Sequence, residues 1–295
     1  SVDDQPGVVE RARAYLAGAP CEPVAPRRAA TVMLVSEGKP HYRRFESPLA
    51  GGAPIEETVD AAPVDVFMLR RASTMAFTPD AVVFPGGGMD ARDVECAVPW
   101  AGPSPEQWAR LMSCTEPEAR GIITAAAREV FEESGVLLAS APGGAAPIDE
   151  RGDHWACERE AVATRQISFG EFLRERGLVL RSDLMRLRSH WVTPESEARR
   201  YDTYFFLARL PEGQHADGRT SEAVEAAWIA PGEALMRFDA GLLKLVPPTI
   251  SNLTSIVAAT SVDEAWNTPF DGHVRPHPVA RACGEVVLGC EVSET

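Results

Sequence analysis

The stretch Arg128-Glu129-Val130-Phe131-Glu132-Glu133-Ser134-Gly135-Val136 places three glutamates within five residues, just ahead of a glycine. On a helix, residues three and four apart share a face, so Glu129, Glu132 and Glu133 are expected to project together, opposite an apolar side. Like charges held this close repel and raise one another's pKa unless a cation lies among them. Hard oxygen ligands at this density suit Mg²⁺ or Mn²⁺. The stretch predicts either a metal-binding helix face or a solvated acidic one, which is what most charge runs are.

A glycine-rich loop upstream favours the metal site. Phe84-Pro85-Gly86-Gly87-Gly88 and residues 128–136 together resemble the signature of the Nudix hydrolases, a loop-helix-loop that binds divalent metal. The second half of that signature, Arg-Glu-apolar-x-Glu-Glu-x-Gly-apolar, matches at every defined position. In the first half, Asp93 stands where the family has glutamate, and residues 94–127 replace the usual seven.

A similar interrupted signature occurs in the branch of this family that includes the peroxisomal acyl-CoA diphosphatases. The resemblance covers roughly residues 27–260 and implies an α/β fold, a Nudix-type α/β/α sandwich with a mixed sheet and helical insertions. It also rests on four further stretches: Val66-Phe67-Met68-Leu69-Arg70-Arg71, His190-Trp191-Val192-Thr193-Pro194, Arg199-Arg200-Tyr201-Asp202-Thr203-Tyr204-Phe205-Phe206 and Leu245-Val246-Pro247-Pro248-Thr249.

The expected organisation is one Nudix domain with additions. We predict an N-terminal extension at 1–26, the domain at 27–260 with insertions at about 94–120 and 139–187, and a C-terminal tail at 261–295. Ser104 and Thr115 are typical first residues of helices, and the second of these helices should stop at Gly135. Apolar spacing in Phe169-Gly170-Glu171-Phe172-Leu173 indicates a helix, interpreted either as core packing or as a cap over the substrate, and we favour the cap. In the tail, only residues 285–288 suggest an edge strand.

Composition narrows the class of protein. The chain has 295 residues, of which 45% are hydrophobic and 24% charged, enough to bury a full core. A net charge of −14 argues against binding to nucleic acid, and no apolar run is long enough to span a membrane. Residues 1–10 do not read as a secretory signal, and the six cysteines form no C-x-x-C pair, so we expect a cytoplasmic protein.

The resemblance implies roles for the residues of the signature. Glu129 and Glu133 would be the principal metal ligands, with Glu132 bridging or holding a second ion and a loop carbonyl of Gly87 or Gly88 as a further ligand. Arg128 would orient Glu129 or the loop.

A further carboxylate is expected from a distant loop, as a metal ligand or as the catalytic general base. Glu222 is the first choice and Glu225 the reserve, and for each an exposed strand charge is the alternative reading.

Four arginines are candidates for contacts with substrate phosphate, namely Arg70, Arg71, Arg199 and Arg200. Because side chains alternate along a strand, at most one of each pair should reach the site, and we choose Arg71 and Arg200.

The expected function is metal-dependent hydrolysis of a phosphoanhydride bond in a small-molecule nucleoside diphosphate derivative. CoA or acyl-CoA is the leading substrate, and NADH, ADP-ribose or a nucleotide sugar are alternatives. A Nudix-fold sensor that binds nucleotides without hydrolysis is the second hypothesis, but the glutamate cluster is complete here. A second copy of the chain, in a homodimer, is the one macromolecular partner we include.

Overall fold

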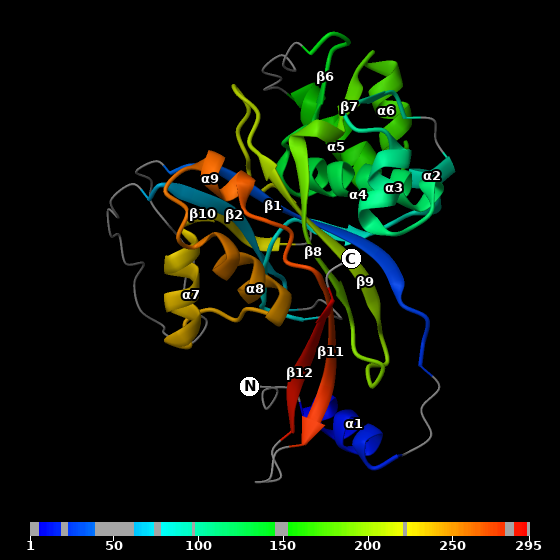
Figure 1. Ribbon diagram of the computed structural model, residues 1–295. Helices are drawn as coiled ribbons and strands as arrows, with labels where there is room; N and C mark the ends of the chain where they lie inside the picture. The colour runs from blue at the N-terminus through cyan, green and yellow to red at the C-terminus, as the bar shows by residue number, and fades with distance from the viewer. Residues whose placement is uncertain are drawn as a thin grey trace.

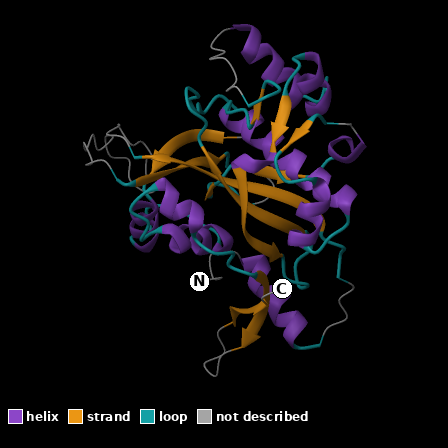
Figure 2. Cartoon of the chain, turned by 45° about the horizontal axis from the view of Figure 1, so that its top comes forward, coloured by secondary structure: helices purple, strands orange, loops and turns teal. Residues whose placement is uncertain are grey.

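A mixed sheet forms the centre of the protein, in a computed structural model that describes residues 6–18, 23–38, 62–73, 78–95, 98–144, 153–220, 223–280 and 286–293 (Figures 1 and 2). Its strand order is β10-β2-β1-β9-β8-β11-β12, with β3 beside β2 and β4 beside β1. The β1/β9 and β8/β11 pairs are parallel and the other pairs antiparallel, which confirms the predicted mixed sheet. The strands are β1 (Arg27–Glu37), β2 (Val64–Arg71), β3 (Val82–Val83), β4 (Gly86–Gly88), β8 (Met185–Val192), β9 (Tyr201–Arg209), β10 (Ala223–Ile229), β11 (His273–Ala280) and β12 (Val286–Ser293).

Helices cover both faces of this sheet, so the α/β/α sandwich is confirmed (Figure 2). Alternation along β1 divides the core: Val32 and Leu34 face one hydrophobic cluster, whereas Met33 and Val35 face the other. The first cluster is covered by α2 (Ala91–Glu95), α3 (Pro105–Met112), α4 (Glu116–Ser134), α5 (Asp153–Ala163) and α6 (Phe169–Glu175). The second is covered by α7 (Pro231–Asp239), α8 (Pro247–Ile256) and α9 (Val262–Asn267).

The long helix α4 begins and ends where the sequence predicts. Thr115 is its N-cap, and its hydroxyl accepts from the N–H of Glu118 while the Glu118 carboxylate accepts from the Thr115 N–H. At the other end Gly135 has a φ of 73°, the left-handed conformation that only glycine adopts cheaply. The α4 side chains that face the first hydrophobic cluster are nearly all buried. The caps at Thr115 and Gly135 therefore set the ends of a helix that lies in the centre of the fold.

The second insertion packs against α4 as part of the core. Phe131 of α4 lies 5.0 Å from Phe172 and 5.2 Å from Trp155, measured between ring centroids. Phe172 is 1% exposed and Leu173 0%. The interpretation of this helix as a cap over the substrate is therefore wrong for these side chains, because their apolar faces are used to cover α4. A small sheet joins both insertions, with β5 (Trp100–Ala101), β7 (Val179–Arg181) and β6 (Ala139–Ser140), and η2 (Ser182–Leu184) follows it.

The C-terminal tail differs from the prediction, because it adds two strands to the main sheet instead of one. β12 is an edge strand, as expected, but it runs from Val286 to Ser293 and pairs with β11 along its whole length. β11 contains Pro276 and Pro278, which argue against a strand in the sequence. Both prolines are tolerated because β8 pairs with β11 only at His273 and Val274. Beyond these two residues, no strand in the described part of the chain lies on that side of β11, so the N–H groups that the prolines lack are not needed for pairing. This hairpin and α1 (Pro6–Leu16) extend together from the body of the protein (Figure 1).

Within the described residues, no helix combines the length and the apolar character that a membrane crossing requires.

Candidate active site

The glycine loop lies directly against the last two turns of α4. β4 pairs antiparallel with β1, which places Gly87 opposite Ala30. The N–H of Gly86 donates to Oε2 of Glu133 at 2.8 Å. A Cβ atom at Gly87 would lie 2.4 Å from Oε1 of Glu129, so any side chain at this position would displace that carboxylate. Two of the predicted metal ligands are thus held against the loop backbone.

Arg128 connects the acidic residues of the site. Its Nε and Nη2 donate to the two carboxylate oxygens of Asp93, both at 3.0 Å. Its Nη1 donates to Glu129 at 2.8 Å and to Glu132 at 3.1 Å, and Nη2 also donates to the carbonyl of Gly88 at 3.0 Å. Burial alone would lower the pKa of Arg128, but Glu129, Asp93 and Glu132 together raise it above its ordinary value. The guanidinium therefore stays charged and ties three carboxylates to the loop.

Asp93 holds Arg128 in place. It lies in the short helix α2, is 3% exposed, and also accepts from the N–H of Asp90 at 2.8 Å. An aspartate reaches less far than the glutamate of the family signature, but α2 brings its backbone close enough for a bidentate pair. Although aspartate replaces the glutamate of the family signature, the carboxylate that pairs with Arg128 is therefore retained.

The donor set of the site fits a hard divalent cation. Glu129 and Glu132 have side chains that are 12% and 15% exposed, and Glu133 is 6% exposed, so three carboxylates gather in a mostly buried place. Such a concentration of negative charge favours a cation, and oxygen ligands suit Mg²⁺ or Mn²⁺. In the described part of the chain, however, no group of three or more acidic, histidine or cysteine side chains is arranged so that it could hold a metal ion. Arg128 lies between Glu129 and Glu132 in this arrangement.

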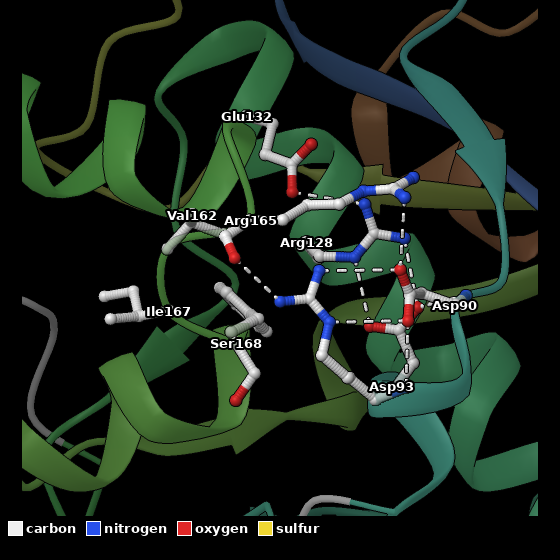
Figure 3. Close-up of a pocket in the computed structure, with 10 residues that line it drawn as sticks. Asp90, Asp93, Arg128, Glu132, Val162, Arg165, Ile167 and Ser168 are labelled. Atoms are coloured by element: carbon white, nitrogen blue, oxygen red, sulfur yellow. Dashed lines mark hydrogen bonds and ion pairs between the residues drawn. The ribbon is translucent and has the colours of Figure 1, made fainter.

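A small depression lies beside Arg128 and Glu132 (Figure 3). The turn between α5 and α6 forms its other wall. Nη1 of Arg92 donates to the carbonyl of Arg165 at 3.0 Å, and Asp90 lies 3.6 Å from the Arg165 guanidinium. The second insertion therefore reaches the edge of the site through polar contacts, although its aromatic residues belong to the core.

Comparison with known proteins decides the family. The family model of the NUDT19 Nudix domain matches residues 106–256, about half of the chain. The acyl-coenzyme A diphosphatase NUDT19 of Gallus gallus is 30% identical over 282 residues, which cover 81% of this chain and 70% of that protein. The chain belongs to the Nudix hydrolase family.

Other Nudix proteins agree in sequence and structure. The human acyl-coenzyme A diphosphatase NUDT19 is 28% identical over 273 residues, covering 81% of this chain and 70% of that protein. A crystal structure of a Nudix hydrolase from Alicyclobacillus acidocaldarius is 27% identical and superimposes with a TM-score of 0.61, covering 84% of this chain and 99% of that one. The protein is therefore a Nudix hydrolase that cleaves a diphosphate linkage, and enzymes of this family use divalent metal ions.

The remaining predicted residues differ in their surroundings. Glu222, the first choice for the distant carboxylate, lies outside the described residues. Glu225 accepts from Nε of Arg70 at 2.9 Å, across the β10/β2 pair. Arg200 donates to the carbonyls of Thr193 and Val24, at 3.0 and 2.9 Å. Its role in substrate binding stays a prediction.

The other two candidate arginines, Arg199 and Arg71, differ from Arg200 in their exposure or hydrogen bonding. Arg199 is exposed. Arg71 follows Arg70 at the end of β2, and its buried Nε has no hydrogen-bond partner among the described residues. Arg92 was not predicted from the sequence, because no pattern distinguishes it from other surface arginines. The fold brings its guanidinium to Asp90 and to the second insertion.

Proposed function

We propose that Glu129, Glu132 and Glu133, with the carbonyl of Gly87, hold Mg²⁺ or Mn²⁺ against the diphosphate of a nucleoside diphosphate derivative, and that this derivative is CoA or an acyl-CoA. The observation that carries the proposal is the contact between the glycine loop and the end of α4. There, one glutamate accepts from the Gly86 N–H and another fills the space that a side chain at Gly87 would occupy.

The protein's own residues have distinct roles in this proposal. When bound, the divalent ion neutralises phosphate charge and lowers the pKa of a water molecule. The hydrogen bond from the Gly86 N–H directs the Glu133 carboxylate at the loop. Arg128 orients Glu129 and Glu132, and Asp93 orients Arg128.

A distant carboxylate would accept the proton of the attacking water. We assign this role to Glu222, with Glu225 as the reserve. The contact between Glu225 and Arg70 supports this order, because a carboxylate oxygen that already accepts a hydrogen bond from a guanidinium is less available to a water molecule.

Arg71 is our choice for binding a substrate phosphate. A buried guanidinium nitrogen without a partner is costly, and a phosphate oxygen would satisfy it. Arg200 is the second choice, because two of its nitrogens already donate to backbone carbonyls.

The substrate class rests on the relatives. The chicken and human proteins, 30% and 28% identical to this chain, are named acyl-coenzyme A diphosphatases. We extend that activity to this chain as a proposal, with NADH, ADP-ribose and nucleotide sugars as competing substrates. Cys114, Cys157 and Cys290 are free thiols among the described residues, which supports a reducing compartment such as the cytoplasm. A homodimer is also compatible with the proposal.

Hydrolysis of a substrate panel tests this function. The purified protein with Mg²⁺ or Mn²⁺ is incubated with CoA, acyl-CoA, NADH, ADP-ribose and a nucleotide sugar, and products are identified by mass. We expect a phosphomonoester product from CoA or acyl-CoA, and a rate about a thousandfold lower for Glu129→Gln, since several kcal/mol of charge stabilisation are lost. An unchanged rate in the variant would refute the metal assignment. Turnover of another panel member in preference to CoA would refute only the substrate.

A further inference from the structure

The C-terminal end of α4 is held by groups from outside the helix. The last carbonyls of a helix have no partner within it and need other donors. Here the Glu132 carbonyl accepts from Nε of Arg159 at 3.0 Å, and the Ser134 carbonyl accepts from the N–H of Asp217 at 2.8 Å. Arg159 belongs to α5, in the second insertion, and Asp217 to the segment between β9 and β10. Two regions distant in sequence thus meet at the turn that carries Glu132 and Glu133.

These two outside groups are also joined to each other. Nη1 of Arg159 donates to Oδ1 of Asp217 at 2.5 Å. Arg159 is 7% exposed, so its guanidinium is removed from water and depends on these two acceptors. The planar guanidinium fixes the angle between its donors, which sets the helix carbonyl and the Asp217 carboxylate at a defined separation. Oδ1 of Asp217 also accepts from the N–H of Arg219 at 3.0 Å, so the segment is ordered around the same atom.

Gly135 leaves room for this arrangement. A Cβ atom at Gly135 would lie 2.9 Å from Nη1 of Arg159. The glycine therefore serves two purposes, because its φ of 73° ends the helix and its lack of a side chain admits the guanidinium.

We propose that Arg159 is a positioning residue for the metal-binding carboxylates. It acts through the backbone of Glu132, and so sets where the side chains of Glu132 and Glu133 point relative to the glycine loop. The proposal rests on the metal site described under the proposed function. Attachment of the insertion does not itself require Arg159, since Phe131, Trp155 and Phe172 already form an aromatic contact between α4 and the insertion. What the guanidinium adds is a direct hold on the last turn, where a displacement of about 1 Å can cost a hundredfold in rate.

Mn²⁺ affinity, measured by electron paramagnetic resonance without substrate, tests this role separately from activity. For Arg159→Ala we expect about tenfold weaker Mn²⁺ binding and about tenfold lower kcat, with KM changed by less than about threefold. Arg159→Lys keeps the charge but cannot present a fork to both acceptors, so its Mn²⁺ affinity and kcat should lie between those of Arg159→Ala and the wild type. The lysine variant also covers the case in which the alanine variant fails to fold.

Arg176→Ala is the matched control. Arg176 lies at the end of α6 in the same insertion and donates to Glu158 at 2.8 Å, away from the α4 carbonyls. We expect it to lower Tm, as Arg159→Ala does, but to leave Mn²⁺ affinity and kcat within about twofold of the wild type. Folded Arg159→Ala or Arg159→Lys with wild-type Mn²⁺ affinity would overturn the proposal, as would equal weakening in Arg176→Ala.

A further variant separates this proposal from the proposed function. Glu133→Gln should lose Mn²⁺ binding. If Glu133→Gln binds Mn²⁺ as the wild type does, the metal site itself is wrong, and the positioning role falls with it. If Glu133→Gln loses binding while Arg159→Ala retains it, only the role of Arg159 is overturned.

Discussion

The two ends of α4 carry ionic networks that differ in how the acidic side chains are paired. At the N-terminal end, Glu118 accepts from Thr115 and from Arg28 at 3.0 Å, and Arg28 also pairs with Asp202. At the C-terminal end, Asp93, Glu129 and Glu132 converge on the single guanidinium of Arg128. One end thus combines its acids with helix-capping donors, whereas the other concentrates carboxylates around one cation. Acidic side chains thus cap the helix at its N-terminal end, whereas those at its C-terminal end are the ligands of the metal site that we propose.

The largest expected effect comes from exchanging one glutamate at each end. Glu133→Gln should lower the hydrolysis rate by about a thousandfold, because a charged ligand is lost from the metal site. Glu118→Gln should leave the rate within about twofold and cost about 1 kcal/mol or less of unfolding free energy, since glutamine can still cap Thr115 but loses the charge facing Arg28. Steady-state kinetics and urea unfolding measure both. Equal loss of activity in the two variants would contradict the proposed division between the ends of α4.

A smaller effect is expected from the aspartates that hold the two arginines. Asp93→Asn removes the charged bidentate partner of Arg128, so we expect hydrolysis to fall by about 10- to 100-fold. Asp202→Asn at the other end should reduce stability but leave the kcat of the folded protein within about threefold. Rates are compared after circular dichroism has established that each variant is folded. If the Asp202 variant loses more activity than the Asp93 variant, the two networks are not separate in function.

The smallest expected effect is a dependence of stability on pH at the N-terminal network. His190 bonds to Asp202 through Nε2, and its Nδ1 lies 2.6 Å from Nδ1 of His273 in the C-terminal hairpin. Burial, then His190 and Arg275, lower the pKa of His273, against an opposing effect of Asp202. Since the folded-state pKa lies below the unfolded one, near 6.5, the stabilising contribution is complete above about pH 6.5 and is lost as pH falls toward the folded-state pKa.

His273→Gln tests this dependence. Urea unfolding of the wild type should lose more free energy between about pH 7.5 and about pH 5.5 than unfolding of the variant, because the variant has no proton to gain at this position. The same pH slope in both proteins would show that His273 does not contribute. Around the two histidines lie Asp202 and Tyr204 of β9 and Phe270 of the segment between α9 and β11.

Local chemistry made much of the fold predictable. Caps at Ser104, Thr115 and Gly135 act within a few residues, so the limits of α3 and α4 could be predicted from sequence. Strand β11 could not be predicted from sequence, because its two prolines argue against a strand. They are compatible with one only because most of β11 pairs with a neighbouring strand on one side, and that pairing is known only from the structure. The prediction of a cap over the substrate was wrong for a similar reason. Burial of Phe172 depends on Phe131, forty-one residues away in the chain.

The functional site, like the fold, could be predicted from the sequence only in part. The sequence alone determined the family, the α/β/α fold, and the presence of Glu129, Glu132 and Glu133 on one helix, because helical spacing and the signature are local properties. Only the tertiary structure decided that Asp93 holds Arg128, that Glu225 pairs with Arg70, and that Arg159 contacts the last turn of α4. The physical reason is that hydrogen bonds between distant segments depend on how those segments pack, and helical or strand periodicity carries no information about the partner.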